Sequence, residues 1–85
     1  MVWNEERARQ LGETVRRLRR ERRLSQETLA FQSGITKNQV QLIEAGKASG
    51  RADTTSPSNP RLSTLTGLAN TLGMDTSELL AQAGM

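Results

Sequence analysis

Aliphatic residues recur at steps of three and four positions near the start of the chain, which is the spacing of one face of a helix. The residues of this stripe are Ala8, Leu11, Val15 and Leu18. They predict an amphipathic helix over roughly 4–23. Gly12 lies inside the pattern and weakens the helix slightly, which indicates close packing against a neighbour.

Two shorter helices follow, separated by a glycine. Ser25 is a good N-cap, because its hydroxyl can accept a hydrogen bond from a free amide in the first helical turn. Gly34 then supplies the left-handed backbone that a sharp turn needs. Thr36 and Gln39 form a T-x-x-Q capping box that begins the next helix. Capped helices joined in this way over about 25–45 are typical of a helix-turn-helix.

The helix that begins after Thr36 is expected to cover about 37–45 and to have two distinct faces. Val40 and Ile43 turn inward. The outward face carries three polar residues, Lys37, Asn38 and Gln41. Gly46 ends the helix in the C-cap position.

The aliphatic pattern resumes in the last third of the chain, at Leu62, Leu65, Leu68, Ala69 and Leu72. It predicts a fourth helix that stops near Gly73, and Asp75 with Glu78 forms the capping box of a fifth. Residues 47–60 are rich in Ser, Thr, Gly and Pro and predict an exposed loop, whose length invites a functional explanation. The fold class predicted is all-α, a compact five-helix bundle with residues 1–85 as one domain and no strand.

The composition narrows the classes of function. Without cysteine or histidine the chain has no disulfide, no thiolate nucleophile, no zinc site of the usual ligand types and no base poised near neutral pH. We therefore expect no metal and no cofactor, and an enzyme is the least supported class. No apolar run has the length of a bilayer span and the N-terminus is too charged for a signal peptide, so we expect a cytoplasmic protein.

Positive charge is concentrated in the first part of the chain. Residues 1–50 carry ten Lys or Arg against six acids, whereas residues 51–85 carry two against three. Six of the eight residues in Arg16–Arg23 are arginine. Such a run suits a polyanionic partner, but a solvated helix face explains it equally well.

From about Leu11 to Leu80 the sequence resembles the phage repressor and Cro family of helix-turn-helix domains, also called the XRE family. The most specific matches are Leu24-Ser25-Gln26, Leu29-Ala30, Gly34-Ile35, Ile43-Glu44-Ala45-Gly46-Lys47 and the segment from Pro60 to Leu80. Each piece alone is a weak signal, but their order and spacing are specific. The resemblance implies a lambda-repressor-like domain that binds double-stranded DNA.

The resemblance also implies that the third helix enters the major groove, with Lys37, Asn38 and Gln41 at the base edges. Their chemistry fits, because Lys can donate to guanine, and Asn and Gln can form paired hydrogen bonds with adenine. Without the surrounding motif, three polar residues on a helix would be expected simply to face water. Leu42 stands where many relatives carry a polar residue, and it either touches a thymine methyl or packs beside Ile43.

Contacts with DNA phosphates are expected from a second set of residues, namely Gln26, Thr36, Gln39, Lys47 and Arg51. Arg19 and Glu44 match a family pair that joins the first helix to the end of the third. If partly buried, this ion pair fixes orientation more than it adds stability.

The leading functional hypothesis is a sequence-specific transcriptional regulator, a repressor that binds a palindromic operator as a homodimer. The expected dimer interface involves Met74, Leu80 and Met85, although these residues could instead complete the monomer core. One alternative is an antitoxin-like autoregulator that also binds a toxin protein. Another is a protein-interaction module that does not bind DNA.

The chain departs from the family at several places. The link from Gly46 to Pro60 is about ten residues longer than the usual family turn. Lys47 and Arg51 therefore either reach phosphates or the minor groove, or they belong to a mobile surface insertion. Arg61 occupies the position where a Ser or Thr usually caps the fourth helix, so this helix either starts at a different residue or is capped by Asn59. Trp3 and Phe31 are the only aromatic residues, and Phe31 is expected on the exposed side of the second helix. They either cover each other or mark a partner surface, and packing is the favoured interpretation.

Overall fold

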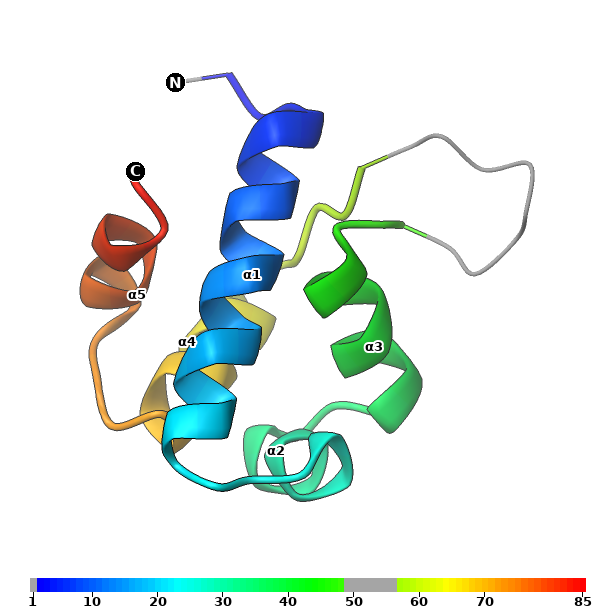
Figure 1. Ribbon diagram of the computed structural model, residues 1–85, viewed down its shortest axis with the longest axis vertical. Coiled ribbons are helices and arrows are strands. Elements are labelled where there is room, and N and C mark those ends of the chain that lie inside the picture. Colours follow the sequence, from blue (N-terminus) through cyan, green and yellow to red (C-terminus); the bar gives the residue numbers. More distant parts are fainter. Residues whose placement is uncertain (1, 49–56) are drawn as a thin grey trace.

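Five helices make up the part of the chain that the computed structural model describes, residues 2–48 and 57–85. They are α1 (Glu5–Glu21), α2 (Gln26–Ser33), α3 (Lys37–Ala45), α4 (Leu62–Thr71) and α5 (Thr76–Gln82) (Figure 1). These residues contain no strand, and their single β-bridge pairs Lys47 with Pro57 in antiparallel orientation. The predicted all-α fold of five helices is confirmed.

Local capping sets the boundaries of α2 and α3. The Ser25 hydroxyl accepts a hydrogen bond from the Thr28 amide at 3.0 Å, and Gly34 ends α2 with a φ of 76°. The Thr36 hydroxyl accepts from the Gln39 amide at 3.1 Å, while the Gln39 side chain accepts from the Thr36 amide at 2.8 Å. Because these caps satisfy free amides at both helix starts, the turn between α2 and α3 has a defined geometry.

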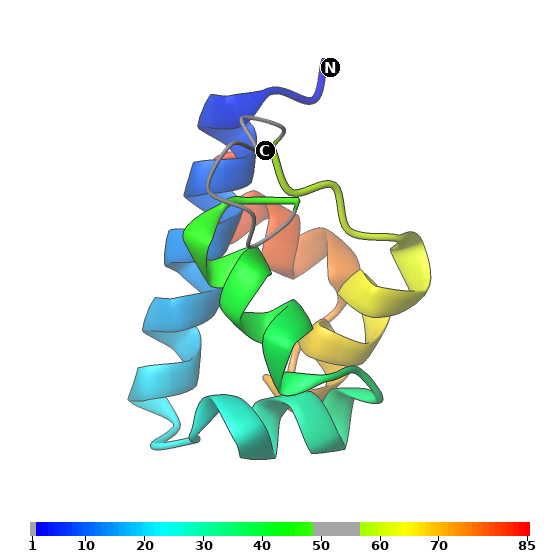
Figure 2. The same cartoon turned by 90° about the vertical axis from the view of Figure 1, so that its right-hand side faces the viewer.

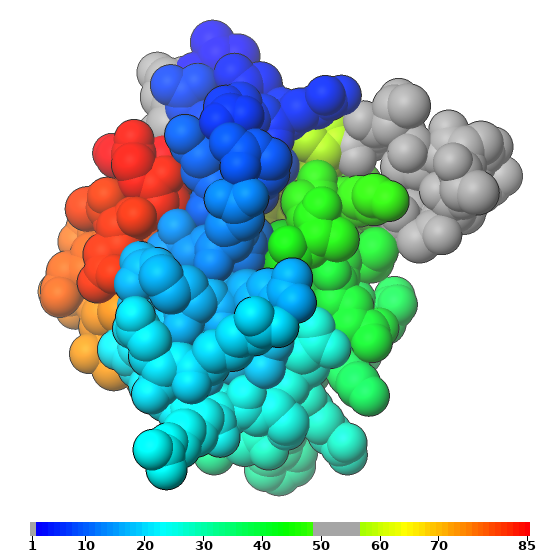
Figure 3. Space-filling model, in the orientation of Figure 1, coloured from blue at the N-terminus to red at the C-terminus, as the bar shows by residue number. Residues whose placement is uncertain are grey.

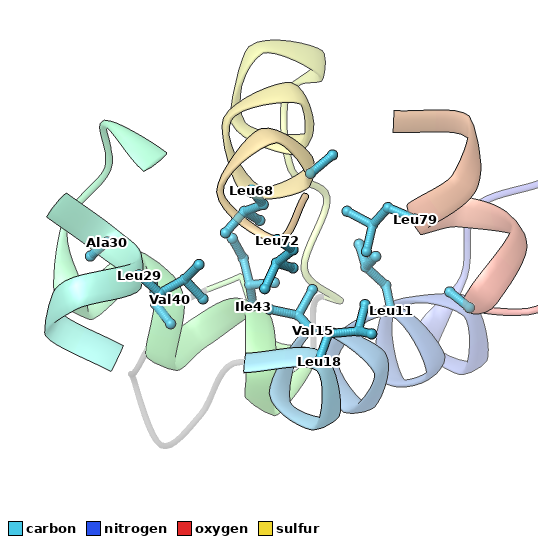
Figure 4. Packing of buried hydrophobic residues seen from close by; sticks show 12 residues of the cluster. Leu11, Val15, Leu18, Leu29, Ala30, Val40, Ile43, Leu68, Leu72 and Leu79 are labelled. Carbon is cyan, nitrogen blue, oxygen red and sulfur yellow. The ribbon is translucent and has the colours of Figure 1, made fainter. Parts of the chain in front are cut away.

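The apolar faces of the helices meet in one core, which Figure 4 shows from close by. Its largest fully buried side chains are Leu11, Val15, Leu29, Val40, Leu68, Leu72 and Leu79. In this view the side chains of α1, α3 and α4 converge at the centre, and Leu79 of α5 covers the side of α1. The inner face of α3 therefore packs against the core through Val40 and Ile43.

Two glycines allow helices to approach closely. A Cβ atom on Gly12 would lie 2.3 Å from the Ile43 carbonyl oxygen, so α1 and α3 are in backbone contact at this point. A Cβ atom on Gly67 would lie 2.4 Å from the Ser33 carbonyl oxygen, which brings α4 equally close to α2. The expectation that Gly12 marks close packing is confirmed.

Three expectations about side chains are wrong. Leu62 belongs to the predicted aliphatic stripe but is 71% exposed, because it lies at the first position of α4, before the helix reaches the core. Phe31 does not pack, since its side chain is 85% exposed on the outer face of α2. Asn59 does not cap α4, whose N-cap is Arg61 without a side-chain hydrogen bond.

The two ends of the predicted 47–60 loop lie together rather than in open solvent. Besides the bridge at Lys47, the Ser58 amide donates to the Gly46 carbonyl at 3.0 Å, and Ser58 is only 5% exposed. The Trp3 indole donates to the Ser58 carbonyl and packs partly against the core. The N-terminal segment therefore fastens the base of this loop. Arg51 lies outside the described residues.

Candidate nucleic-acid interface

In the part of the chain that the structure describes, the outer face of α3 is exposed to solvent. Figure 1 shows α3 on the side of α1 away from α5, and in Figure 2 no helix lies over its outer side. Lys37, Asn38 and Gln41 are all exposed on this face, whereas Val40 and Ile43 are buried behind it. We call these three exposed polar residues the α3 polar face. It has the arrangement that a helix needs to enter a duplex groove.

An ion pair between α1 and α3 holds the C-terminal end of this helix. Arg19 Nε donates to Glu44 Oε2 at 2.7 Å, and Arg19 Nη2 donates to Glu44 Oε1 at 3.1 Å. Arg19 Nη1 also donates to the Leu24 carbonyl at 2.8 Å, which ties the connection before α2 to the same guanidinium. With side chains 12% and 4% exposed, the pair is shielded from solvent and fixes the orientation of α3.

Gln26 is connected to this ion pair, which sequence reasoning did not reveal. Its side-chain amide donates to Glu44 Oε1 at 3.1 Å, so Glu44 receives hydrogen bonds from both α1 and α2. The contact joins residues 18 positions apart in sequence, and no local pattern indicates it. It orients Gln26 at the start of α2, where free amides and the helix dipole favour an anion.

Thr36 and Gln39 are exposed at the start of α3, and the capping box occupies only part of their hydrogen-bonding capacity. The Thr36 oxygen and the Gln39 carbonyl oxygen accept the capping hydrogen bonds. The Thr36 hydroxyl proton and the Gln39 amide protons remain as donors. Donors at the positive end of a helix suit a phosphate oxygen.

Leu42 and Lys47 lie at the other edge of α3. The half-buried Leu42 lines an open groove of about 510 Å³ between α3 and the start of α4, whose far wall includes Pro60 and Arg61. Lys47 is exposed at the rim of this groove. Nine of the predicted DNA-contact and ion-pair residues thus lie on α3, its flanks and the start of α2, and Arg19 of α1 is joined to them through Glu44. Of these two sets, only Arg51 lies outside the described residues.

The residues predicted for a dimer interface lie away from α3. Met74, Leu80 and Met85 are each partly buried against the core, and Leu79 beside them is fully buried. The three therefore contribute to the monomer core with part of their surface and leave the rest accessible at the α5 side of the molecule.

Among the described residues there is no cluster of acidic side chains that could hold a metal ion, and no helix is long and apolar enough to cross a membrane. A family model described as "Helix-turn-helix domain" matches residues 10–82 of the chain. The match begins at Gln10, inside α1, and ends at the last residue of α5, and it includes the whole α3 polar face. No curated protein and no solved structure matches the chain.

Proposed function

This chain belongs to the helix-turn-helix domain family, and from that premise we propose that it is a sequence-specific regulator of transcription that represses by occupying a palindromic operator as a homodimer. Helix-turn-helix domains of this kind bind DNA and regulate transcription. The observation that carries the proposal is the α3 polar face, which is exposed, rigidly oriented and free of covering helices.

The proposed base contacts follow from the chemistry of this face. Lys37 donates to guanine O6 and N7, while Asn38 and Gln41 form paired hydrogen bonds with adenine N6 and N7. Leu42 is placed at the edge of the face, where it contacts a thymine methyl if the helix lies deep in the groove. Each well-formed pair contributes about 1–3 kcal/mol of discrimination against a wrong base.

Phosphate contacts on both sides of α3 position the helix. We assign Gln26 to this role at the start of α2, together with Thr36 and Gln39 at the start of α3, because these groups lie at positive helix ends and retain free donors. Lys47 adds a cation at the end of α3, and Arg51 extends the proposed set into the loop.

We propose a homodimer because of the size of the domain and the two-fold symmetry of a palindromic operator. The domain measures 33 Å along its longest axis, and half-sites separated by one helical turn of DNA lie about 34–36 Å apart. One domain thus covers one half-site, and a two-fold pair doubles the contacts. The accessible parts of Met74, Leu80 and Met85 are the proposed pairing surface.

The exposed Phe31 favours a second candidate, an autoregulator that also binds a protein such as a toxin. The Phe31 ring is 85% exposed on α2, so it can insert into an apolar pocket of a partner protein. In this second function the chain still binds DNA through α3, and it also binds a partner protein at α2. Co-purification of a small protein with the native chain, lost in Phe31→Ser, distinguishes it from a stand-alone repressor.

Selection of bound sequences from a pool of random duplexes tests the proposal. We expect enrichment of an inverted repeat whose half-sites are centred about one helical turn apart. Enrichment of a single, unrepeated site would refute the dimer, and no enrichment would refute sequence-specific binding.

A further inference from the structure

The arginine side chains of Arg16–Arg23, a run that begins in the second half of α1, have different surroundings. Arg17 pairs with Glu21 at 3.2 Å and also donates to Gln82 at 3.2 Å. Arg22 donates to the Leu18 carbonyl at 3.2 Å. Arg19 forms the buried ion pair with Glu44.

Arg16 and Arg20 differ from these three. Both side chains are exposed, and within residues 2–48 and 57–85 neither makes a hydrogen bond or an ion pair. They are four positions apart on α1, so they lie on one side of the helix with Cβ atoms about 6 Å apart.

The two arginines line an open depression of about 370 Å³. One side of it is formed by α1, and the other side by the start of α2 and the outer side of α3. Its opposite wall includes Gln26 and Gln41, which are the proposed phosphate-binding and base-contacting residues nearest to α1. Figure 3 shows the surfaces of α1 and α3 side by side on one face of the molecule, and Figure 2 shows the same neighbourhood from another direction. We call this depression the α1–α3 groove.

The acidic groups around the groove are already neutralised. Glu44, on its floor, accepts from Arg19 and Gln26. Glu13 borders Arg16 and Arg20 on the outer side but pairs with Arg9 at 2.7 Å, and Glu21 on that side pairs with Arg17. Arg16 and Arg20 are therefore two cations that no acidic side chain among the described residues pairs with, and their positive potential favours an anion in the groove.

We propose that the α1–α3 groove binds phosphates of the DNA strand that borders the major groove on the α1 side of α3, with Arg16 and Arg20 as the contacting residues. The inference rests on the proposed function, because it requires Gln41 to face the base edges. The sugar-phosphate backbone beside Gln41 then runs along the α1–α3 groove. The guanidinium groups of Arg16 and Arg20, one helical turn apart, contact neighbouring phosphates. Arginine suits this role because its planar group donates two parallel hydrogen bonds to phosphate oxygens.

The test compares two double variants of equal charge by their binding to a duplex of random sequence over a range of salt concentrations. Arg16→Gln with Arg20→Gln removes the proposed contacts. Arg17→Gln with Arg22→Gln removes two cations from the same helix that already have protein partners, so it controls for net charge. Since each phosphate contact contributes about 0.9 to the slope of log affinity against log salt, the first variant is expected to reduce the slope by about 1.8 and the control by less than half of that.

Arg16→Lys with Arg20→Lys keeps both charges and is expected to retain most of the slope, while thermal unfolding checks that every variant is folded. An equal reduction in the two glutamine variants overturns the groove assignment and leaves the proposed function standing. If the wild-type chain shows no salt-dependent binding to duplex, both the proposed function and this inference are wrong.

Discussion

Arg19 and Glu44 form a two-point ion pair that fastens α1 to the end of α3, with donor–acceptor distances of 2.7 and 3.1 Å. Because Glu44 also accepts from Gln26, one buried carboxylate links the first three helices. The pair lies beside the α3 polar face, where Arg19, Glu44 and Gln41 border the α1–α3 groove. Its geometry therefore fixes the orientation of α3 relative to α1.

Removing one partner of this pair is expected to destabilise the fold. Glu44→Ala leaves the Arg19 guanidinium partly buried without a carboxylate, and we expect the free energy of unfolding to fall by about 3 kcal/mol. Arg19→Met combined with Glu44→Leu removes both charges and is expected to recover most of that loss. Urea denaturation measures both variants. A loss below about 1 kcal/mol in Glu44→Ala would show that water already solvates the pair.

Gly12→Ala tests the close approach of α1 and α3. Alanine is the better helix former, but its Cβ would meet the Ile43 carbonyl oxygen at 2.3 Å, so we expect a net destabilisation of about 1–3 kcal/mol. Gly67→Ala is the matched control, since it creates a similar clash between α4 and α2 without touching α3. Both variants should unfold at lower temperature, but only Gly12→Ala should also weaken discrimination between DNA sequences.

Trp3 is expected to stabilise the base of the 47–60 loop. Trp3→Phe keeps most of the apolar contact but removes the indole donor to the Ser58 carbonyl, which should cost about 1 kcal/mol. Hydrogen exchange of the Ser58 amide, which donates to Gly46, reports the loosening directly. Val2→Ala is the control, because Val2 is 76% exposed. Unchanged protection of Ser58 in Trp3→Phe would rule out the anchoring role.

A pH effect is expected at the start of α1. The Arg9 guanidinium donates to Glu6 and holds the pKa of that carboxyl below its usual range. Because the folded pKa lies below the unfolded one, this interaction contributes stability above the unfolded pKa and loses it as the pH falls through the folded pKa. An NMR titration of Glu6 should show the lowered pKa, and Arg9→Gln should return it to the ordinary range.

The sequence predicts the helices of this fold well because their signals are local. Ser25, Thr36 and Gly34 act within one helical turn, and the aliphatic stripe of α1 needs only the period of the helix. The α3 polar face follows from the same period, since the inward positions of Val40 and Ile43 determine which residues remain outside.

The two omitted hydrogen bonds join distant segments, and two of the errors concern whether an apolar side chain reaches the core. Leu62 continues the aliphatic stripe of α4, yet its position at the first turn places it beyond the reach of the core. The hydrogen bonds from Trp3 to Ser58 and from Gln26 to Glu44 join residues 55 and 18 positions apart, so no local spacing indicates them. The helical pattern indicates that Phe31 lies on the exposed side of α2, and the expectation that it nevertheless packs is wrong.

The most direct test of the central claim is the ratio of affinity for a selected duplex to affinity for random duplex, measured for the wild-type chain and for Asn38→Ala with Gln41→Ala. Because these two side chains lie on the α3 polar face without contributing to the core, the variant should fold normally. We expect the ratio to fall by the equivalent of about 2–6 kcal/mol, while binding to random duplex stays nearly unchanged. An unchanged ratio would show that Asn38 and Gln41 do not contact the bases and would contradict the account.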